Sequence, residues 1–243
     1  MSTSILQAHR QKTYRVRHRE FLLAAIKRMR VDGLTSVNLT ALASESAYSK
    51  GTWYNHFKSA EALYVEIAVV NAELLHSYVA DIRDDPTLKS HERLASVFIC
   101  AVAHAMTHPE IWMLGINARI WDKHSHTSLT EPVERLTQWE RASYELILQF
   151  AVEAQVDGSR TADETTEALD IVRAAADGLG VLTTATAEHR WTREVTNHQT
   201  GTLLKSALAA GGFQTPTQPE MDRLCTQSWE RISRHSESWL VPR

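Results

Sequence analysis

The stretch "NLTALASESAYSKGTWYNHFKSAEAL", residues 38–63, carries three helix-start signals in close succession. The side chains of Asn38, Ser49 and Ser59 can each accept a hydrogen bond from a backbone N–H group in the first turn of a following helix. Within the second segment, Trp53 and Phe57 are four residues apart and share one face of a helix. The sequence therefore predicts a short helix, a tight turn, a second short helix packed through its aromatic residues, and then a long helix.

One further helix is predicted before this stretch. Apolar residues recur at helical spacing over residues 17–31, and the Asp32-Gly33 pair ends the pattern. Before residue 17 we expect a flexible basic arm. Three small helices before a long one, with a tight turn between the second and third, are the pattern of a helix-turn-helix DNA-binding unit.

Residues 38–63 resemble the DNA-binding segment of the TetR family of bacterial transcriptional regulators. The match is "SKGTWYNHF", residues 49–57, against a family pattern of serine, lysine, glycine, a small polar residue, an apolar residue, tyrosine, any residue, histidine and phenylalanine. Three positions depart from the family: Ala47 replaces the usual turn glycine, Tyr48 a smaller apolar residue, and Ala60 a lysine. The last change removes an expected phosphate contact and leaves the expected fold unaltered.

The polar residues of the second short helix are the candidate DNA contacts. Asn55 and Thr52 are the predicted base readers, since an amide can pair with adenine and a threonine methyl can touch thymine. Gly51 allows close backbone approach, and Lys50, Tyr54 and His56 are assigned to phosphates. The full predicted set is Arg17, Thr40, Ser49, Lys50, Gly51, Thr52, Tyr54, Asn55, His56 and Lys58. The alternative is that these are ordinary surface groups of a small helical unit.

The charge distribution favours a polyanionic partner at one end of the chain. Residues 1–60 contain ten Lys and Arg against three Asp and Glu, and the remaining residues contain 16 against 26. Five of the bases, Arg10, Lys12, Arg15, Arg17 and Arg19, lie in or next to the predicted arm. A solvated charge run would give the arm the same composition, but its position beside residues 49–57 favours DNA.

The remainder of the chain is predicted to be helical, at about residues 88–107, 110–123, 131–153, 162–189, 193–210 and 219–239. We therefore predict an all-α protein with a DNA-binding domain at residues 1–60. A larger effector-binding and dimerisation domain would occupy residues 61–239. The final "LVPR", residues 240–243, matches the end of a thrombin-cleavable purification tag and is interpreted as a tag remnant.

The resemblance implies a homodimer in which helices at residues 162–189 and 193–210 pair with their copies. Small residues in "EALDIVRAAADGLGVLTTATAEHRW", residues 167–191, would permit close helix approach. The predicted interface residues are Ala174, Ala175, Gly178, Leu182, Leu204 and Leu208. A helix buried within one subunit would carry the same pattern, so the pattern alone does not distinguish the two.

The resemblance also places a cavity for a small-molecule effector in the middle of the larger domain. Its candidate lining residues are large, adaptable or aromatic: Phe98, Met106, Trp112, Met113, Trp121, Trp139 and Tyr144. Such residues more often belong to a solid core. The sequence does not identify the effector, although Glu110 or Glu145 would suit a cation if either were buried.

Four histidines offer an alternative class of function. His104 and His108 are four residues apart, with His124 and His126 downstream, so a zinc enzyme using Glu110 as general base is conceivable. The HExxH spacing is absent. We therefore expect a protein that is not an enzyme and has no catalytic residues, metal or cofactor.

The cellular location is predicted from what the sequence lacks. No apolar run approaches the roughly 18 residues of a membrane span, and the first residues lack the apolar core of a signal peptide. Cys100 and Cys225 form no metal-type pair and are expected to be reduced and buried. We predict a cytoplasmic protein with no membrane partner.

The predicted function is that of a ligand-responsive transcriptional regulator. As a repressor, a homodimer would bind a palindromic operator in double-stranded DNA and be released by a small molecule. An alternative with the same fold is a DNA-binding protein without a small-molecule effector. An accessible cavity in the larger domain would distinguish the two.

Overall fold

The computed structural model describes residues 2–33, 37–121, 130–158, 160–184 and 195–240. Within these ranges the regular elements are ten α-helices, with one isolated bridge between Gln155 and Phe213, which confirms the predicted all-α class. In chain order the helices are α1 (Ser2–Asp32), α2 (Leu39–Ser44), α3 (Lys50–His56), α4 (Ala60–Arg83), α5 (Ser90–Thr107), α6 (Pro109–Trp121), α7 (Thr130–Glu153), α8 (Ala162–Thr184), α9 (Asn197–Ala210) and α10 (Gln218–Leu240).

The helix starts near residues 38–63 are set by local hydrogen bonds. The side chains of Asn38, Ser49 and Ser59 each accept a hydrogen bond from a backbone N–H two or three residues ahead, as predicted. Gly33 ends α1 with a φ of 88°, a left-handed conformation that favours glycine, and its N–H donates to the carbonyl of Met29 at 2.9 Å.

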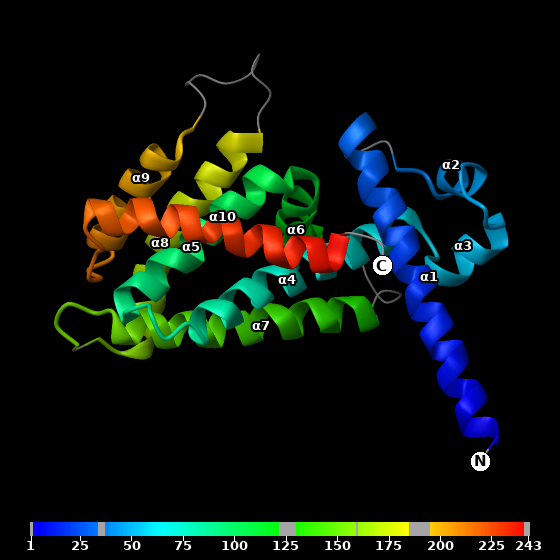
Figure 1. Cartoon of the computed structure of the whole chain (residues 1–243), viewed down its shortest axis with the longest axis horizontal. Coiled ribbons are helices and arrows are strands. Elements are labelled where there is room, and N and C mark those ends of the chain that lie inside the picture. The colour runs from blue at the N-terminus through cyan, green and yellow to red at the C-terminus, as the bar shows by residue number, and fades with distance from the viewer. Residues whose placement is uncertain (1, 34–36, 122–129, 159, 185–194, 241–243) are drawn as a thin grey trace.

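The arm expected before residue 17 is helical, because α1 is continuous from Ser2, and its N-terminal half projects away from the other helices (Figure 1). Residues 7–16 are exposed on this projecting part. They include no Gly or Pro, and helix extension is easy once a packed segment such as residues 21–29 has formed the first turns. The basic residues of the predicted arm therefore lie on a helix.

Helices α1, α2 and α3 pack around two aromatic rings. Phe21 stacks on Trp53 with ring centroids 4.0 Å apart, and Trp53 is fully buried, as its spacing predicted. Its Nε1–H donates to Ser46 Oγ at 2.9 Å, which fixes the turn between α2 and α3. No described residue other than glycine has a positive φ, so Ala47 occupies the family's glycine position without left-handed strain.

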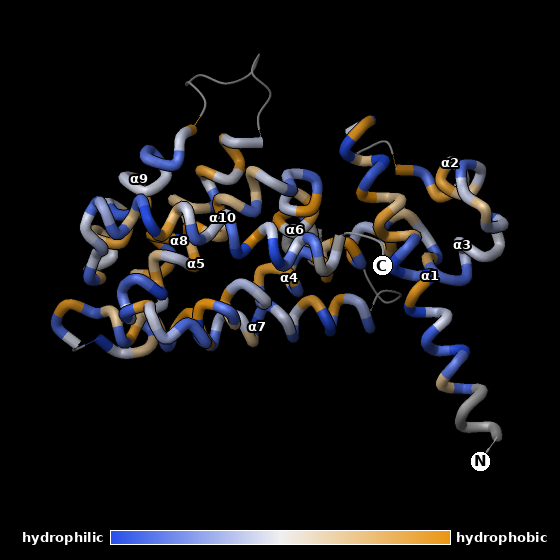
Figure 2. The backbone as a smooth tube through the Cα atoms, viewed as in Figure 1, coloured by the Kyte–Doolittle hydropathy of each residue, from blue (hydrophilic) through white to orange (hydrophobic). Residues whose placement is uncertain are grey.

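The remaining helices form a bundle that α4 enters from the α1–α3 end (Figure 1). Helix α4 packs on α6 and α7, and α5 packs on α4, α8 and α10. Apolar and hydrophilic residues alternate along these helices (Figure 2), and many of the apolar ones are buried between the helices. The apolar core is continuous from Phe21 and Trp53 through Leu63 and Ile67 to Ile232, so α4 belongs to both parts.

Two further properties of the chain follow from the helices and their burial. Cys100 and Cys225 are free and buried, as predicted. No single helix among the described residues is long and apolar enough to cross a membrane. Helix α5 and the first part of α6 reach that length only as a pair bent by 113°.

Candidate functional sites

The first candidate site is the outer face of α3, which we define as Lys50, Gly51 and Asn55 together with Lys58 just beyond the helix. All four residues are exposed, while Trp53 on the opposite side is buried against Phe21. The Nζ atom of Lys50 lies 5.6 Å from the ring centroid of the half-buried Tyr54. A Cβ atom on Gly51 would meet only Ser49 Oγ, at 3.8 Å, so open space lies above its backbone.

Several predicted DNA contacts already make hydrogen bonds within the protein. The Ser49 and Thr52 hydroxyl groups are 2.9 Å apart, and Ser49 Oγ also caps α3. The Nζ atom of Lys58 donates to the Tyr54 carbonyl at 3.2 Å. Thr40 is exposed in the first turn of α2, two residues after Asn38, which caps this helix. Asn55, by contrast, is exposed on α3, and its side-chain amide takes no part in the described hydrogen bonds that hold the helix.

His56 packs against α1 and does not face outward. Its ring stacks on Tyr14 with centroids 4.2 Å apart, and its Nδ1 lies 3.3 Å from Nδ1 of His18. Burial, followed by the charges of His18 and Arg17, lowers the pKa of His56 to about 4. The ring is therefore neutral near pH 7, and this arrangement does not favour the phosphate contact predicted for His56. It instead ties the end of α3 to α1.

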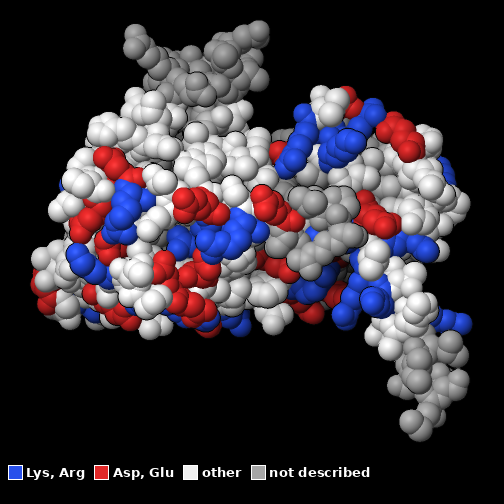
Figure 3. Space-filling model, viewed as in Figure 1, with Lys and Arg blue, Asp and Glu red and all other residues white. Residues whose placement is uncertain are grey.

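A basic residue of α1 lies beside the turn that leads into α3. Residues 1–19 contain no Asp or Glu. Arg17 is half-buried with its guanidinium 5.1 Å above the Tyr48 ring, and the Tyr48 hydroxyl donates to Glu20. Lys and Arg atoms lie along α1, while the surface of the helical bundle shows both signs of charge (Figure 3). The positive charge predicted for an arm is thus carried by a helix packed beside α3.

The second candidate site is a cavity of about 520 Å³ that is lined by residues of α4, α5, α6, α7 and α8 and is partly open to solvent. Of the predicted lining residues, Phe98, Trp112 and Tyr144 line it. Met106, Met113 and Trp139 do not: Trp139, for example, packs against Leu136 and lies 4.9 Å from the His76 ring. Helix α6 ends at Trp121, whose side chain lies outside the described residues.

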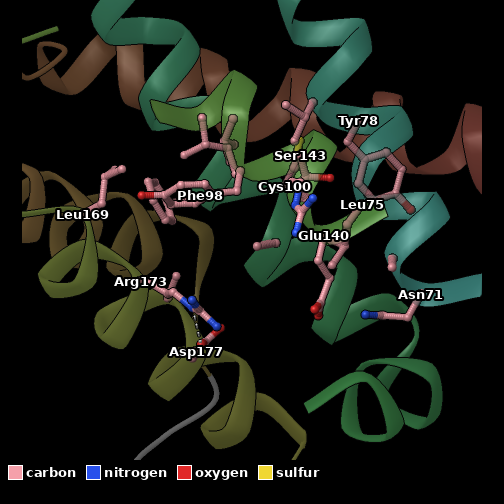
Figure 4. Close-up of a pocket in the computed structure, with 18 of the residues that line it drawn as sticks. Asn71, Leu75, Tyr78, Phe98, Cys100, Glu140, Ser143, Leu169, Arg173 and Asp177 are labelled. Carbon is pink, nitrogen blue, oxygen red and sulfur yellow. Dashed lines mark ion pairs between the residues drawn. The ribbon is translucent and has the colours of Figure 1, made fainter. Parts of the chain in front are cut away.

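The polar lining of the cavity was missed by the sequence analysis. It comprises Asn71 and Tyr78 on α4, Thr137, Glu140, Arg141 and Ser143 on α7, and Asp170, Arg173 and Asp177 on α8. Figure 4 shows the Asn71 amide, the Glu140 carboxylate and the Arg173–Asp177 ion pair around one end of the cavity. The one sequence signal was Asn71 inside the apolar run "EIAVVNAELL". Glu110 and Glu145, the carboxylates considered for a cation, do not line this cavity.

A buried histidine joins two of the cavity residues. His104 has Nε2 at 3.0 Å from Asn71 Oδ1 and Nδ1 at 3.0 Å from the Tyr78 hydroxyl. Because Oδ1 can only accept, Nε2 carries the proton and the Tyr78 hydroxyl donates to Nδ1. Burial, followed by the charge of His108, lowers the pKa of His104 to about 3. The ring is therefore a neutral link between the two side chains.

A second histidine ties α1 to the bundle. Arg30 of α1 donates to His108 Nδ1 at 2.9 Å and to the buried carboxylate of Glu110 at 2.5 Å. His108 Nε2 lies 2.7 Å from Ser236 Oγ on α10, and the His104 and His108 ring centroids are 5.2 Å apart. Burial and then Arg30 lower the pKa of His108 to about 4. A row of buried polar groups thus runs from the cavity to α1.

These contacts also bear on the zinc alternative. The ring nitrogens of His104 and His108 all lie within hydrogen-bond distance of protein groups. His124 and His126 lie outside the described residues. Across the part of the chain that the structure describes, no group of three or more His, Cys, Asp or Glu side chains could hold a metal ion.

The predicted dimer residues divide into two sets. Ala174, Gly178 and Leu182 are exposed on α8, and Ala175 is half-buried. Leu204 and Leu208 are fully buried inside the chain, so assigning them to an interface is wrong. Helix α9 turns them toward the core and exposes Leu203 instead. The large apolar residues exposed on α8 and α9 are Ile171, Val181, Leu182 and Leu203.

Comparison of the sequence with known protein families and with characterised proteins finds no family model and no protein that matches it. The resemblance of residues 38–63 to the TetR family therefore stays a prediction. The geometry of α3, of the cavity and of the exposed face of α8 is the basis for a proposed function.

Proposed function

We propose that this protein is a ligand-responsive, DNA-binding transcriptional regulator of the TetR type that acts as a homodimeric repressor. The observation that carries the proposal is the outer face of α3. Two short helices joined by a tight turn, the second exposing Lys50, Gly51 and Asn55 beside a basic helix, have the order and surface of a helix-turn-helix unit. The domain division at about residue 60 belongs to this proposal.

The exposed part of α8 supports a second copy of the chain as the partner. Ile171, Ala174, Gly178 and Leu182 recur at helical spacing on the side of α8 that faces away from the core. Apolar surface of this kind favours association, and the small residues permit close helix approach. A two-fold dimer would present two α3 helices to successive major grooves of a palindromic operator.

The cavity favours a regulator that responds to a small molecule over a DNA-binding protein without a small-molecule effector. Its volume of about 520 Å³ and mainly apolar lining are typical of sites for small organic ligands. Asn71 and Tyr78 line the cavity and also hold His104, which is beside His108 and its partner Arg30 on α1. A ligand that binds better when these groups are rearranged would shift the population away from the DNA-bound form.

Two α3 variants test the proposal by separating affinity from specificity. Operator fragments are first selected from a random duplex pool. Lys50→Ala removes a phosphate contact from each subunit, so the magnitude of the salt slope should fall by roughly 1.8 with all duplexes weakened alike. Asn55→Ala should leave the slope unchanged and lose on the order of 1–3 kcal/mol of discrimination at one base pair per half-site.

Both variants are titrated against the selected operator and a scrambled duplex at several salt concentrations. Lys89→Ala is the matched control, because Lys89 pairs with Glu220 on the bundle, away from α3. Failure of the wild-type protein to enrich any duplex would contradict the proposed function. If Asn55→Ala instead weakened both duplexes equally and flattened the slope, Asn55 would be a phosphate contact and Thr52 the leading base reader.

Gly51→Ala is expected to separate stability from DNA binding. The added methyl group meets no atom closer than 3.8 Å, so the free energy of unfolding should stay unchanged or rise by about 0.5 kcal/mol. On DNA the same methyl group would hold the backbone of α3 away from the groove, and operator affinity should fall roughly tenfold. Thermal unfolding and operator titration measure the two effects. Retention of full affinity would show that Gly51 is not at the DNA contact.

A further inference from the structure

The side-chain amide of Asn71 presents its nitrogen to the cavity. Asn71 lines the cavity and is only 5% exposed. Its Oδ1 lies 3.0 Å from His104 Nε2, whereas its Nδ2 has no hydrogen-bond partner among the described residues. Figure 4 shows the amide nitrogen turned into the space beside Glu140. A buried N–H donor is costly to leave without a partner, so this position favours a ligand that accepts a hydrogen bond.

Helix α6 leaves room for the amide in this position. The Asn71 Nδ2 atom lies against the backbone of Gly115, where an added Cβ atom would clash with both Nδ2 and Cγ of Asn71. Any residue other than glycine would therefore force the amide to move. The place of the donor on the cavity wall is thus set by two helices, α4 and α6.

The hydrogen bonds behind Asn71 decide which end of the amide faces the cavity. At the far end of the row, Arg30 can only donate, so His108 Nδ1 accepts and the neutral ring carries its proton on Nε2, toward Ser236. The Ser236 hydroxyl accepts this proton's hydrogen bond and is left to donate to another group. Burial raises the pKa of Tyr78, and a hydrogen bond with Ser236 acts against the rise, so that group is the Tyr78 hydroxyl.

The second half of the row continues in the same direction. The Tyr78 hydroxyl donates to His104 Nδ1, and the neutral ring carries its proton on Nε2. Because Nε2–H needs an acceptor, the oxygen of the Asn71 amide faces His104 and the nitrogen faces the cavity. The row begins at Arg30 on α1, a residue that cannot accept, and this fixes the amide as a donor.

The buried surroundings of the donor favour an uncharged acceptor. Among the described lining residues the two cations, Arg141 and Arg173, are exposed, and Arg173 is paired with Asp177 at 3.5 Å. The His104 ring behind Asn71 is neutral. An ionised acceptor at the Asn71 amide would be removed from water without a buried counter-charge, which is costly. A carbonyl oxygen is an uncharged acceptor that brings no donor of its own.

We infer that the effector is an uncharged carbonyl compound, such as a ketone, ester, lactone or amide, whose oxygen accepts a hydrogen bond from Asn71 Nδ2. The apolar body of such a ligand would lie against the apolar part of the lining, which includes Phe98, Trp112 and Leu169. This inference rests on the proposed function for the role of the cavity as an effector site. The hydrogen bond itself is measurable without DNA.

Two probes of nearly equal shape test the acceptor: 2-acetylnaphthalene, and 2-isopropenylnaphthalene, in which C=CH₂ replaces C=O. Their Kd values are measured by fluorescence titration at pH 7. From wild type to Asn71→Leu, the ratio of the two Kd values should shift roughly tenfold against the ketone, because one hydrogen bond to a buried donor is lost. Comparing the ratio between proteins cancels the difference in hydrophobicity between the probes.

Asn117→Leu is the matched control for this substitution. Asn117 donates to the Met113 carbonyl within α6 and does not line the cavity, so the ratio should stay at the wild-type value. An unchanged ratio in Asn71→Leu, or no binding of either probe to the wild-type protein, would overturn the inference.

Infrared spectroscopy of the ¹³C-labelled ketone tests the same hydrogen bond in the wild-type protein. Hydrogen bonding weakens the C=O bond, so the bound ketone should absorb at lower wavenumber than in hexane. A band at the hexane position would overturn the inference even if Asn71→Leu failed to fold. His104→Gln should keep the shift, because glutamine can accept from Tyr78 and donate to Asn71, whereas His104→Leu should lose it. A shift that persists in His104→Leu would overturn the role of His104 in orienting the amide.

The outcome is separable from that of the proposed function. Ketone binding by a protein that enriches no duplex would support the ligand class and contradict the regulator. Operator binding by a protein that binds neither probe would support the DNA-binding role and overturn the ligand class. When both hold, the ketone should lower operator affinity in wild type and lose that effect in Asn71→Leu. A ketone that binds and leaves operator affinity unchanged would overturn its role as an effector.

Discussion

Lowering the pH from 7 to 5 is expected to reduce the free energy of unfolding by about 4 kcal/mol through His104 and His108 alone. Their pKa values are lowered to about 3 and about 4 in the folded chain, from an ordinary value of 6.5. The unfolded chain therefore binds these protons as the pH falls through 6.5, while the folded chain does not. The stabilisation that these two histidines contribute is fully present above pH 6.5. It is lost progressively as the pH falls toward their pKa values in the folded chain.

His104→Gln should remove about 2 kcal/mol of this pH dependence. The amide can still accept from Tyr78 and donate to Asn71, so the hydrogen bonds are retained while the titrating group is lost. Urea unfolding at pH 7, 6 and 5 measures the change, and stopping at pH 5 avoids most of the carboxylate titration. His9→Gln on the exposed part of α1 is the control.

Equal pH dependence in His104→Gln and wild type would show that His104 is not a buried neutral group. His56 adds a smaller contribution of the same sign, because its lowered pKa is that of a half-buried ring that water partly screens. Replacing His56 as well should flatten the dependence further.

The parts of the fold that depend on neighbouring residues in the chain were predictable. Asn38, Ser49 and Ser59 cap helices because a cap needs only the next two or three backbone N–H groups. Gly33 ends α1 for an equally local reason. Trp53 is buried because its partner Phe21 lies on a helix whose own apolar spacing is clear.

The parts that depend on packing between helices were not predictable. Leu203 and Leu204 are adjacent, and only the docking of α9 on α8 and α10 decides that Leu204 is the buried one. The polar end of the cavity combines Asn71, Glu140 and Asp177 from three helices. No single segment contains that set, and Trp139 shows that an aromatic residue on the correct helix can face a different neighbour.

The same limit applies to the two histidines considered for zinc. Their spacing of four residues places His104, in the last turn of α5, beside His108, the residue that caps the end of α5. The spacing cannot show that the ring nitrogens lie within hydrogen-bond distance of other helices. Their partners are Tyr78 and Asn71 on α4, Arg30 on α1 and Ser236 on α10. Their use in hydrogen bonds is a property of the assembled bundle.

Gly178→Arg is expected to convert a dimer into a monomer and to lower operator affinity by roughly 100-fold at a fixed protein concentration, because two linked contacts become one. A single chain can accommodate the arginine side chain, because Gly178 is exposed on α8 and an added Cβ atom meets no other atom within 4 Å. Effects on folding should therefore be small. In a dimer packed through α8, the guanidinium would instead be forced against the partner's apolar surface.

Sedimentation at micromolar concentration, with thermal unfolding as a check on folding, measures the outcome. Val31→Arg is the matched control, since it adds the same side chain at an exposed apolar position on α1, far from α8 in the sequence, and should leave the dimer intact. Gly178→Ala should also remain dimeric, because a methyl group still permits close approach. A wild-type monomer at these concentrations would contradict the homodimer, and a dimer that persists in Gly178→Arg would place the interface on another face.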